Sequence, residues 1–207
     1  MLKVDGAEVL LVFSVTEVLD YLTEPELVSW MERTSKAKRK QITDEAKEVG
    51  NIVNRLIDLE LASTPQDIPS DTRIKNCMLG WNTFKRDYPS FVQSVTATQE
   101  EISDGDIVGH PDFTHLHGIT DLKCAKSIWP KHWTQTAKYY RMKHGQKDGF
   151  IAILRLDKET GNYEYKKFED QEYIDYEIEV FNAYFIAFRH AMTNREAVRQ
   201  YLENLKA

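Results

Sequence analysis

The chain of 207 residues has little of what several protein classes require. Its two cysteines, Cys77 and Cys124, are too few for a disulfide scaffold, a four-cysteine zinc site or an iron–sulfur cluster. Six prolines and nine glycines exclude a fibrous or low-complexity chain. The most apolar run, from Val9 to Phe13, is far shorter than the ~20 residues of a membrane-spanning helix. We therefore expect a globular protein with reduced thiols, located in the cytoplasm.

Positive charge is in the minority, with 27 lysines and arginines against 33 acidic residues and a formal net charge of -6. Proteins that bind polyanions are usually basic, so this balance taken over the whole chain argues against such a partner. The distribution of charge argues the other way, because residues 122–147 contain seven cationic side chains and no Asp or Glu. The sequence therefore predicts a polarised molecule with one basic face, whose binding to a polyanion would depend steeply on salt.

Hydrophobic periodicity divides the chain, which we expect to form a single domain over 1–207, into three parts. Residues 1–89 are predicted to be mainly helical, residues 90–168 to form a sheet core, and residues 169–207 to form a long C-terminal helix. The order of helices, strands, helix, strands and helix predicts an α/β fold with an αβββαβ core. Helices would flank a mixed central sheet, with N-terminal helices before the core and the long helix after it.

The predicted elements have approximate bounds. In chain order they are a short helix ending at Tyr21, a helix after Pro25, helices over 43–61 and 71–88, strands over 91–98, 107–113 and 119–123, a helix over 129–143, and a hairpin of 149–156 with 163–168.

Two acidic residues and a lysine stand where these strands end. Gly109–Phe113 contains Asp112, and Ile119–Lys123 contains Asp121 and Lys123, which lie two apart and therefore point to the same side of a strand. A short hairpin would bring Asp112 beside Asp121. Two carboxylates with open positions suit Mg²⁺ or Mn²⁺, and a lysine can neutralise developing charge and orient a water molecule. This set of groups is what the hydrolysis of a phosphodiester requires.

The Asp-x-Lys pattern by itself is weak, because a chain of this length shows it once or twice by chance. Its ordinary interpretation is a surface strand with a solvated ion pair, which contributes little to stability. The context favours the functional interpretation. Both acids end strand-like segments, a Gly-x-Pro-Asp turn precedes them, and the helix that follows has Gln135 and Tyr139 on one face.

These residues resemble the PD-(D/E)XK nuclease superfamily and, within it, the RecB-like or phage-type exonuclease group. The matching segments are Pro111-Asp112, Asp121-Leu122-Lys123, and Gln135 to Tyr139, which is similar to that group's Gln-x-x-x-Tyr helix. Fainter matches are Ser14 to Thr16 and Glu48 to Asn54. The resemblance covers about residues 14–168 and implies a restriction-endonuclease-like core, so that the predicted domain would be a nuclease domain.

The resemblance implies a role for each matching residue. Asp112 and Asp121 would bind Mg²⁺ or Mn²⁺ together with the carbonyl oxygen of Leu122, and Lys123 would be the catalytic lysine. Gln135 and Tyr139 would face the active site and contact the DNA backbone or the lysine. A further acid that also binds the metal would come from the preceding strand, where Glu100 is preferred to Glu101 because an apolar residue follows it at +2.

Two positions depart from the pattern of the group. Asn54 stands where the group usually has His, and an amide oxygen is a weaker, neutral ligand than imidazole. Either the carboxylates hold the metal almost unaided, or a helix acid such as Glu45 or Glu48 takes that part. Cys124 follows the lysine where Thr or Ser is common, and we expect it to be packed as a small side chain.

The resemblance implies a metal-dependent DNA nuclease, and more specifically an exonuclease on DNA ends in recombination, repair or phage DNA processing. Its partners would be single-stranded or duplex DNA ends, with recombination or replication proteins as further candidates, in a monomer or small homo-oligomer. No Gly-rich phosphate loop is present, so no nucleotide cofactor is expected. Six cations are predicted to contact DNA: Lys38, Arg39, Lys126, Lys131, Lys138 and Arg141.

Three alternatives remain open from the residues. The first is a weakly catalytic or non-catalytic DNA-end binding module of the same fold, supported by Asn54. The second is a restriction or repair endonuclease, which would cut closed circles. The third is a zinc hydrolase that uses His110, His115 and His117, although a polar hairpin tip is the more ordinary interpretation of those residues.

Overall fold

A computed structural model describes residues 2–4, 7–9, 12–21, 30–64, 66–145 and 148–204 of the chain. The helix predicted after Pro25 begins outside these residues. The helices are α1 (Val15–Asp20), α3 (Lys36–Leu61), α4 (Thr72–Asp87), α5 (Ser90–Ser94), α6 (Pro130–His144) and α7 (Gln171–Asn204). The strands are β1 (Leu2–Val4), β2 (Ala7–Val9), β3 (Phe13–Ser14), β4 (Val95–Thr98), β5 (Ile102–Asp104), β6 (Ile107–Gly109), β7 (Phe113–His115), β8 (Gly118–Lys123), β9 (Phe150–Leu156) and β10 (Tyr163–Phe168).

The main sheet has five strands in the order β10-β9-β8-β7-β4. The β8 and β9 strands are parallel and the other neighbours are antiparallel, so the sheet is mixed. A parallel pair needs a crossover connection, and α6 supplies it between β8 and β9. A smaller sheet, β3-β6-β5, precedes the β7–β8 hairpin in the chain. The predicted α/β class, with helices flanking a mixed sheet, is confirmed.

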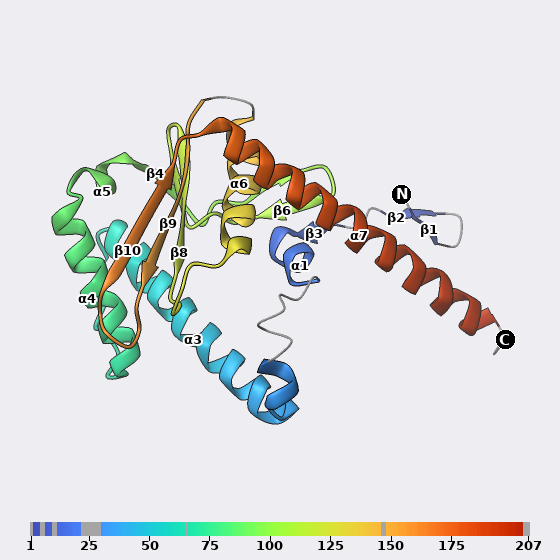
Figure 1. Cartoon of the computed structure of the whole chain (residues 1–207), viewed down its shortest axis with the longest axis horizontal. Coiled ribbons are helices and arrows are strands. Elements are labelled where there is room, and N and C mark those ends of the chain that lie inside the picture. The colour runs from blue at the N-terminus through green and yellow to red at the C-terminus, as the bar shows by residue number, and fades with distance from the viewer. Residues whose placement is uncertain are drawn as a thin grey trace.

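Helices cover both faces of the main sheet (Figure 1). The α3 and α4 helices pack on one face, in a cluster that includes Val53, Trp81 and Leu122. The α6, α7 and α1 helices pack on the other, in a cluster that includes Ile119 and Phe181. Side chains alternate along a strand, so Ile119, Asp121 and Lys123 of β8 all face the α6 side. The hydrophobic pattern of this one strand therefore decides which helix the charged residues meet.

The α3 helix begins at Lys36, seven residues before the predicted start. Ser35 caps it, because its hydroxyl accepts a hydrogen bond from the backbone N–H of Lys38. Lysine, arginine and alanine are good helix formers, and Lys40 pairs with Asp44 one turn later at 2.9 Å. The helix predicted over 43–61 is therefore longer at its N-terminus and includes the basic run 36–40.

Two of the predicted strands are divided. The segment 91–98 forms the short helix α5 and then β4. The reason is that the side chain of Phe91 packs in an aromatic cluster, edge-on against Phe84 with ring centroids 4.8 Å apart. The hydroxyl of Ser94 donates to the carbonyl of Phe91 at 2.7 Å and closes that turn. The segment 107–113 forms β6 and β7, separated at Pro111, which has no backbone N–H for a ladder. The predicted helix over 129–143 and both late strands are confirmed to within a residue or two.

The C-terminal segment is one helix, α7, of 34 residues. Its first half packs on the core through Ile174, Ile178, Phe181 and Phe188. Figure 1 shows its second half extending beyond the sheet. Within the described part of the chain, no helix is long and apolar enough to cross a membrane.

Candidate functional site

The two predicted carboxylates lie side by side on neighbouring strands. Phe113 of β7 pairs with Thr120 of β8, so the antiparallel register places Asp112 next to Asp121. Both are buried, with exposed fractions of 8% and 2%, and the two carboxyl groups are close enough to interact electrostatically. Burial raises the pKa of Asp121 to about 7; the charge of Lys123 opposes this and the charge of Asp112 adds to it. The single positive charge of Lys123 therefore does not fully compensate the two carboxyl groups of Asp112 and Asp121.

Asp112 is held by three N–H donors from three different segments. Its Oδ2 accepts from the backbone N–H of Leu122 at 2.7 Å. Its Oδ1 accepts from the side-chain amides of Asn54 on α3 at 3.0 Å and of Gln99 after β4 at 2.6 Å. Three donors fix the orientation of a carboxylate, and Leu122 contributes its amide here, while the role of its carbonyl stays a prediction.

Lys123 connects the carboxylates to α6. Its Nζ lies 2.6 Å from Oδ2 of Asp121 and donates to Oε1 of Gln135 at 2.9 Å. The amide of Gln135 donates to the Tyr139 hydroxyl oxygen at 3.0 Å and to Oγ1 of Thr16 at 3.4 Å. Burial opposes the charge of Lys123, but the Asp121 and Asp112 carboxylates outweigh it and raise its pKa, so the side chain stays an ammonium.

The Tyr139 ring lies directly on the backbone of Gly109 in β6. A Cβ at position 109 would stand 2.3 Å from Cε1 of Tyr139, which is too close for any carbon atom. Gly109, the first residue of the Gly-x-Pro-Asp turn, is therefore required by the tyrosine of the Gln-x-x-x-Tyr helix. The two motifs, 30 residues apart in sequence, depend on each other through this contact.

Two residues near Asp112 did not follow from the sequence. Gln99 has a φ of +49°, a left-handed conformation that costs a side-chain-bearing residue roughly 1–2 kcal/mol. Asp58 lies one helical turn after Asn54; burial raises its pKa to about 6, a hydrogen bond with Thr98 opposes this, and the charge of Asp112 adds to it. The i, i+4 spacing from Asn54 is a signal that identifies Asp58, whereas nothing in the sequence distinguishes Gln99.

The residues fit a hard divalent cation that takes oxygen ligands. Oδ2 of Asp121 is buried and accepts no hydrogen bond of good geometry, although Lys123 stands beside it. An adjacent second carboxylate and a raised pKa both indicate a place where added positive charge would be stabilising. The described residues contain no group of three His, Cys, Asp or Glu side chains positioned to hold a metal. Water and backbone oxygens would therefore complete the ligand set, as Mg²⁺ prefers.

The acids proposed to complete the site lie elsewhere. Glu100 makes an ion pair with Lys143 of α6 at 2.8 Å, and this lysine lowers the pKa of the carboxyl against the effect of burial. Glu101 is exposed, Glu48 is exposed on α3, and Glu45 pairs with an arginine of α4 at 3.6 Å. The structure does not bring Glu100 into the network of Asp112. The α3 residues that interact with Asp112 are Asn54 and Asp58, and not Glu45 or Glu48.

The cations between residues 122 and 147 do not form a free basic face. Acids pair with five of the six that the structure describes, and four of these acids come from distant segments: Lys123 pairs with Asp121 of its own strand, Lys131 with Asp20, Lys138 with Asp104, Arg141 with Asp175, and Lys143 with Glu100. The sixth, Lys126, is exposed, and Lys147 lies outside the described residues. Charges that are separate in sequence are neutralised in space.

This pairing corrects the predicted DNA contacts. Lys138 is 5% exposed, and its Nζ lies 2.7 Å from Asp104 and over the ring of Phe181, so the structure contradicts an outward role for it. Arg141 makes an ion pair with Asp175 of α7. Lys38 and Arg39 lie in the first turn of α3, which Figure 1 shows projecting away from the sheet. Lys126 and Lys131, on the segment that follows β8, remain next to the carboxylates in the chain.

The three histidines considered as zinc ligands lie in different environments. His115 is buried between Oγ of Ser94 and Oγ1 of Thr120, each 3.0 Å from a ring nitrogen. His110 is exposed, 3.9 Å from Glu101, and His117 is exposed at the hairpin tip. They form no ligand set among the described residues, which is consistent with the structural interpretation of the hairpin.

His115 makes the fold sensitive to acid. Burial lowers its pKa from 6.5 to about 4, so the folded protein holds it neutral while the unfolded chain protonates it below pH 6.5. Its contribution is present above pH 6.5 and is lost as the pH falls to 4, by about 3 kcal/mol. In His115→Gln, urea unfolding between pH 7 and 4 is expected to show a flatter pH dependence. His117→Gln, on the same hairpin, is the control, and an equal slope in both variants would contradict this.

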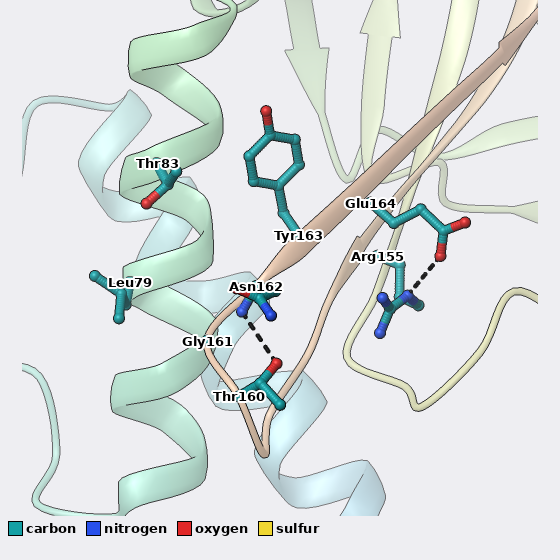
Figure 2. Close-up of a pocket in the computed structure, with 8 residues that line it drawn as sticks. All are labelled: Leu79, Thr83, Arg155, Thr160, Gly161, Asn162, Tyr163 and Glu164. Atoms are coloured by element: carbon teal, nitrogen blue, oxygen red, sulfur yellow. Dashed lines mark hydrogen bonds and ion pairs between the residues drawn. The ribbon is translucent and has the colours of Figure 1, made fainter.

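Arg155 secures the chain where it leaves β8. It pairs with Lys123 in the β8–β9 ladder, and its guanidinium donates to the carbonyls of Ala125 and Lys126, both at 3.3 Å. Asp157 and Glu164 hold the guanidinium in place, at 3.1 and 2.9 Å. Figure 2 shows Arg155 and Glu164 on the strand side of a pocket of about 600 Å³, with α4 on the other side. Arg155 therefore fixes the backbone of the loop that follows Lys123.

Comparison with known proteins gives a likeness of fold. No protein-family model matches the chain, and no curated protein matches it. Among solved structures, it is similar to the alkaline exonuclease LHK-Exo from Laribacter hongkongensis, with 12% identity over 90% of this chain and 93% of that one and a TM-score of 0.41. The complex of LHK-Exo with dAMP has 14% identity over 89% of this chain and 92% of that one, with a TM-score of 0.39. The protein SSO0001 has 13% identity over 86% of this chain and 78% of that one, with a TM-score of 0.40. These likenesses are confined to the course of the backbone.

Proposed function

We propose that this protein is a divalent-metal-dependent nuclease that hydrolyses phosphodiester bonds in DNA. The observation that supports it most is the cluster of Asp112, Asp121 and Lys123. Two carboxylates on neighbouring strands are buried there, and the lysine ammonium lies 2.6 Å from one of them. A structural ion pair needs only one carboxylate beside the lysine, and the second carboxylate adds electrostatic repulsion between Asp112 and Asp121. A bound cation would remove that repulsion.

The residues of the cluster would divide the work. Asp112 and Asp121 would hold Mg²⁺ or Mn²⁺, with the Leu122 carbonyl and water completing the ligands. The bound ion supplies Lewis acidity and lowers the pKa of water. Lys123, kept as an ammonium by the carboxylates, stabilises negative charge that develops on the phosphate. Gln135 orients Lys123.

Supporting residues keep the cluster in one geometry. The amides of Asn54 and Gln99 fix Asp112, and Gln99 does so from a strained backbone that other interactions must maintain. Tyr139 fixes the amide of Gln135. Asp58, one helical turn after Asn54, is a further acid on α3 whose pKa the charge of Asp112 affects. Rigid support of this kind is what catalysis by positioned charge requires.

The finer assignment is an exonuclease of the RecB-like or phage type that acts on single-stranded or duplex DNA ends. It rests on the resemblance of three segments: Pro111-Asp112, Asp121 to Lys123, and Gln135 to Tyr139. Processing of DNA in recombination, repair or phage replication, in the cytoplasm and as a monomer or small oligomer, belongs to the same proposal. Lys126 and Lys131 are the cations best placed in the chain to contact the DNA backbone.

The test is digestion of end-labelled linear DNA and of covalently closed circles, with Mg²⁺, with Mn²⁺ and with a chelator. The wild type is expected to digest linear DNA when metal is present, and Lys123→Ala to be slower by a hundredfold or more, on the order of the loss of one charge-stabilising donor. Lys166→Ala, an exposed lysine on β10, is the matched control. Circles left intact support an exonuclease, and their cutting supports the endonuclease. Full activity in Lys123→Ala would contradict the assignment.

A second candidate, a DNA-end binding module without catalysis, has one observation in its favour. Asp112 already accepts three hydrogen bonds and Asp121 already has an ion pair with Lys123, so both carboxylates have protein partners. Calorimetric titration with Mn²⁺ separates the candidates. The nuclease is expected to bind Mn²⁺ in the wild type and not in Asp112→Asn, whereas a binding module would show no carboxylate-dependent binding.

A further inference from the structure

The two cysteines of the chain, 47 positions apart in sequence, meet in the fold. Cys77 lies on α4 and is fully buried, and Cys124 follows the last residue of β8 and is partly buried. Cys77 belongs to the hydrophobic cluster between α4 and the sheet, Cys124 packs against the same cluster, and the two thiols are close enough to interact. Both are free thiols. The two thiols therefore lie near each other at the end of β8, and one of them follows Lys123 directly in the chain.

We propose that Cys77 and Cys124 are a redox modification site, which closes to a reversible disulfide and so restrains the end of β8 at the candidate active site. The modification itself stands on the contact between the two thiols. Its effect on hydrolysis rests on the proposed function of the Asp112, Asp121 and Lys123 cluster.

The restraint would act through the main chain. Side chains alternate, so Cys124 points to the α4 side while Lys123, joined to it by one peptide bond, points to α6. A disulfide has an S–S length of about 2.05 Å, shorter than any hydrogen-bonded contact, so its formation draws Cys124 toward α4. Lys123 is positioned by contacts of 2.6 and 2.9 Å. A displacement of about 1 Å in a positioned group can cost a hundredfold in rate.

The chemistry needs a two-electron oxidant such as hydrogen peroxide. Cys77 is fully buried, so the peroxide meets Cys124, whose sulfur takes one oxygen as the O–O bond breaks, giving a sulfenic acid and water. The sulfur of Cys77 then attacks the Cys124 sulfur. An S–S bond forms, the S–O bond breaks, and the released hydroxide leaves with the Cys77 proton as a second water. A dithiol reductant reverses the reaction by exchange.

Reaction is expected to be slow at neutral pH. Cys124 is only partly exposed, which restricts the access of peroxide to its sulfur. Millimolar peroxide and incubation for tens of minutes are therefore appropriate, with samples taken over time.

The experiment uses the full chain, treated with peroxide or with dithiothreitol and then denatured with a maleimide that labels free thiols. The reduced chain is expected to take two labels and the oxidised chain none, with a mass lower by two hydrogens before labelling. The disulfide closes a long loop, so the Tm is expected to rise by about 10 °C. Metal-dependent hydrolysis is expected to fall about tenfold or more and to return with dithiothreitol.

Two variants provide the controls. Cys124→Ser changes a partly exposed position and Cys77→Ala a buried one, and neither can form the disulfide. Both are expected to keep their Tm and their rate of hydrolysis through the peroxide treatment. Should Cys77→Ala fold poorly, Cys124→Ser alone still provides the comparison.

The outcomes separate the two parts of the proposal. Two labels retained after peroxide, or sulfinic acid formed without loss of both labels, would overturn the modification site. A disulfide that raises the Tm without changing hydrolysis would overturn its control of the site. A disulfide in a chain that hydrolyses nothing even when reduced would uphold the modification site and overturn the proposed nuclease, together with the control that rests on it.

Discussion

Asp121→Asn is expected to abolish hydrolysis and, at the same time, to make the folded protein more stable. Activity should fall by a hundredfold to a thousandfold or more, because the variant loses a charged ligand and the partner that holds Lys123 at 2.6 Å. Stability should rise because the variant removes a buried negative charge that lies against Asp112. Lys123 keeps Gln135 and its partial contact with solvent, so it is not left without a partner.

The gain in stability should depend on pH in one direction. The pKa of Asp121 is raised from 3.8 to about 7, so as the pH rises the unfolded chain loses this proton first while the folded protein retains it. The unfolding free energy of the wild type therefore falls between pH 4 and 7, a component that Asp121→Asn lacks. The difference between them should therefore grow by about 2–3 kcal/mol between pH 5 and pH 8.

Urea unfolding at both pH values, with a chelator present, measures this difference. Asp44→Asn, an exposed aspartate on α3, is the matched control and is expected to change neither hydrolysis nor the pH dependence. A variant that is less stable than the wild type at pH 8 would show that Asp121 is a structural ion-pair partner. That result would also weaken the case for a cation beside it.

The network could be anticipated from sequence where short-range geometry determines it. The two-residue period of a strand puts Asp121 and Lys123 on one side, and the four-residue period of a helix aligns Gln135 with Tyr139. The structure places these four side chains in one network with Asp112. Their chemical roles remain a proposal, but their positions follow from local rules and from one short hairpin.

The parts that could not be anticipated depend on contacts between distant segments. Lys138 is on a helix whose sequence contains no acid, and its partner, Asp104, comes from β5. Phe91 belongs to a run of β-branched residues, yet aromatic packing holds it in a helical turn. Gln99 reaches Asp112 from a left-handed backbone, and Cys77 of α4 meets Cys124, which follows β8, in a shared hydrophobic cluster. No local pattern encodes such pairings, since each depends on the finished fold.

Gly109→Ala is expected to destabilise the protein and disable the site, whereas the same exchange at Gly50 should stabilise it. The new methyl group at position 109 would stand 2.3 Å from Cε1 and 2.8 Å from Cδ1 of Tyr139, so the ring or β6 must move. Overpacking of this kind costs about 1–3 kcal/mol. Displaced Tyr139 would release Gln135 and, through it, Lys123, so hydrolysis should fall about tenfold or more.

Gly50 lies within α3, where an added Cβ meets nothing within 4 Å. Alanine there should add about 0.5–1 kcal/mol, because glycine is a poor helix residue, and hydrolysis should not change. Urea unfolding of both variants measures the contrast, and equal effects would contradict it.

The double variant Gly109→Ala/Tyr139→Ala tests whether the contact itself is the cause. If the clash with the ring accounts for the loss at position 109, removing the ring gives the methyl group space, and the two changes together should cost less than their sum. Additive effects would instead place the cause in the backbone of β6. Because the ring also holds the amide of Gln135, the double variant should recover stability without recovering hydrolysis, which separates the packing role of Tyr139 from its positioning role.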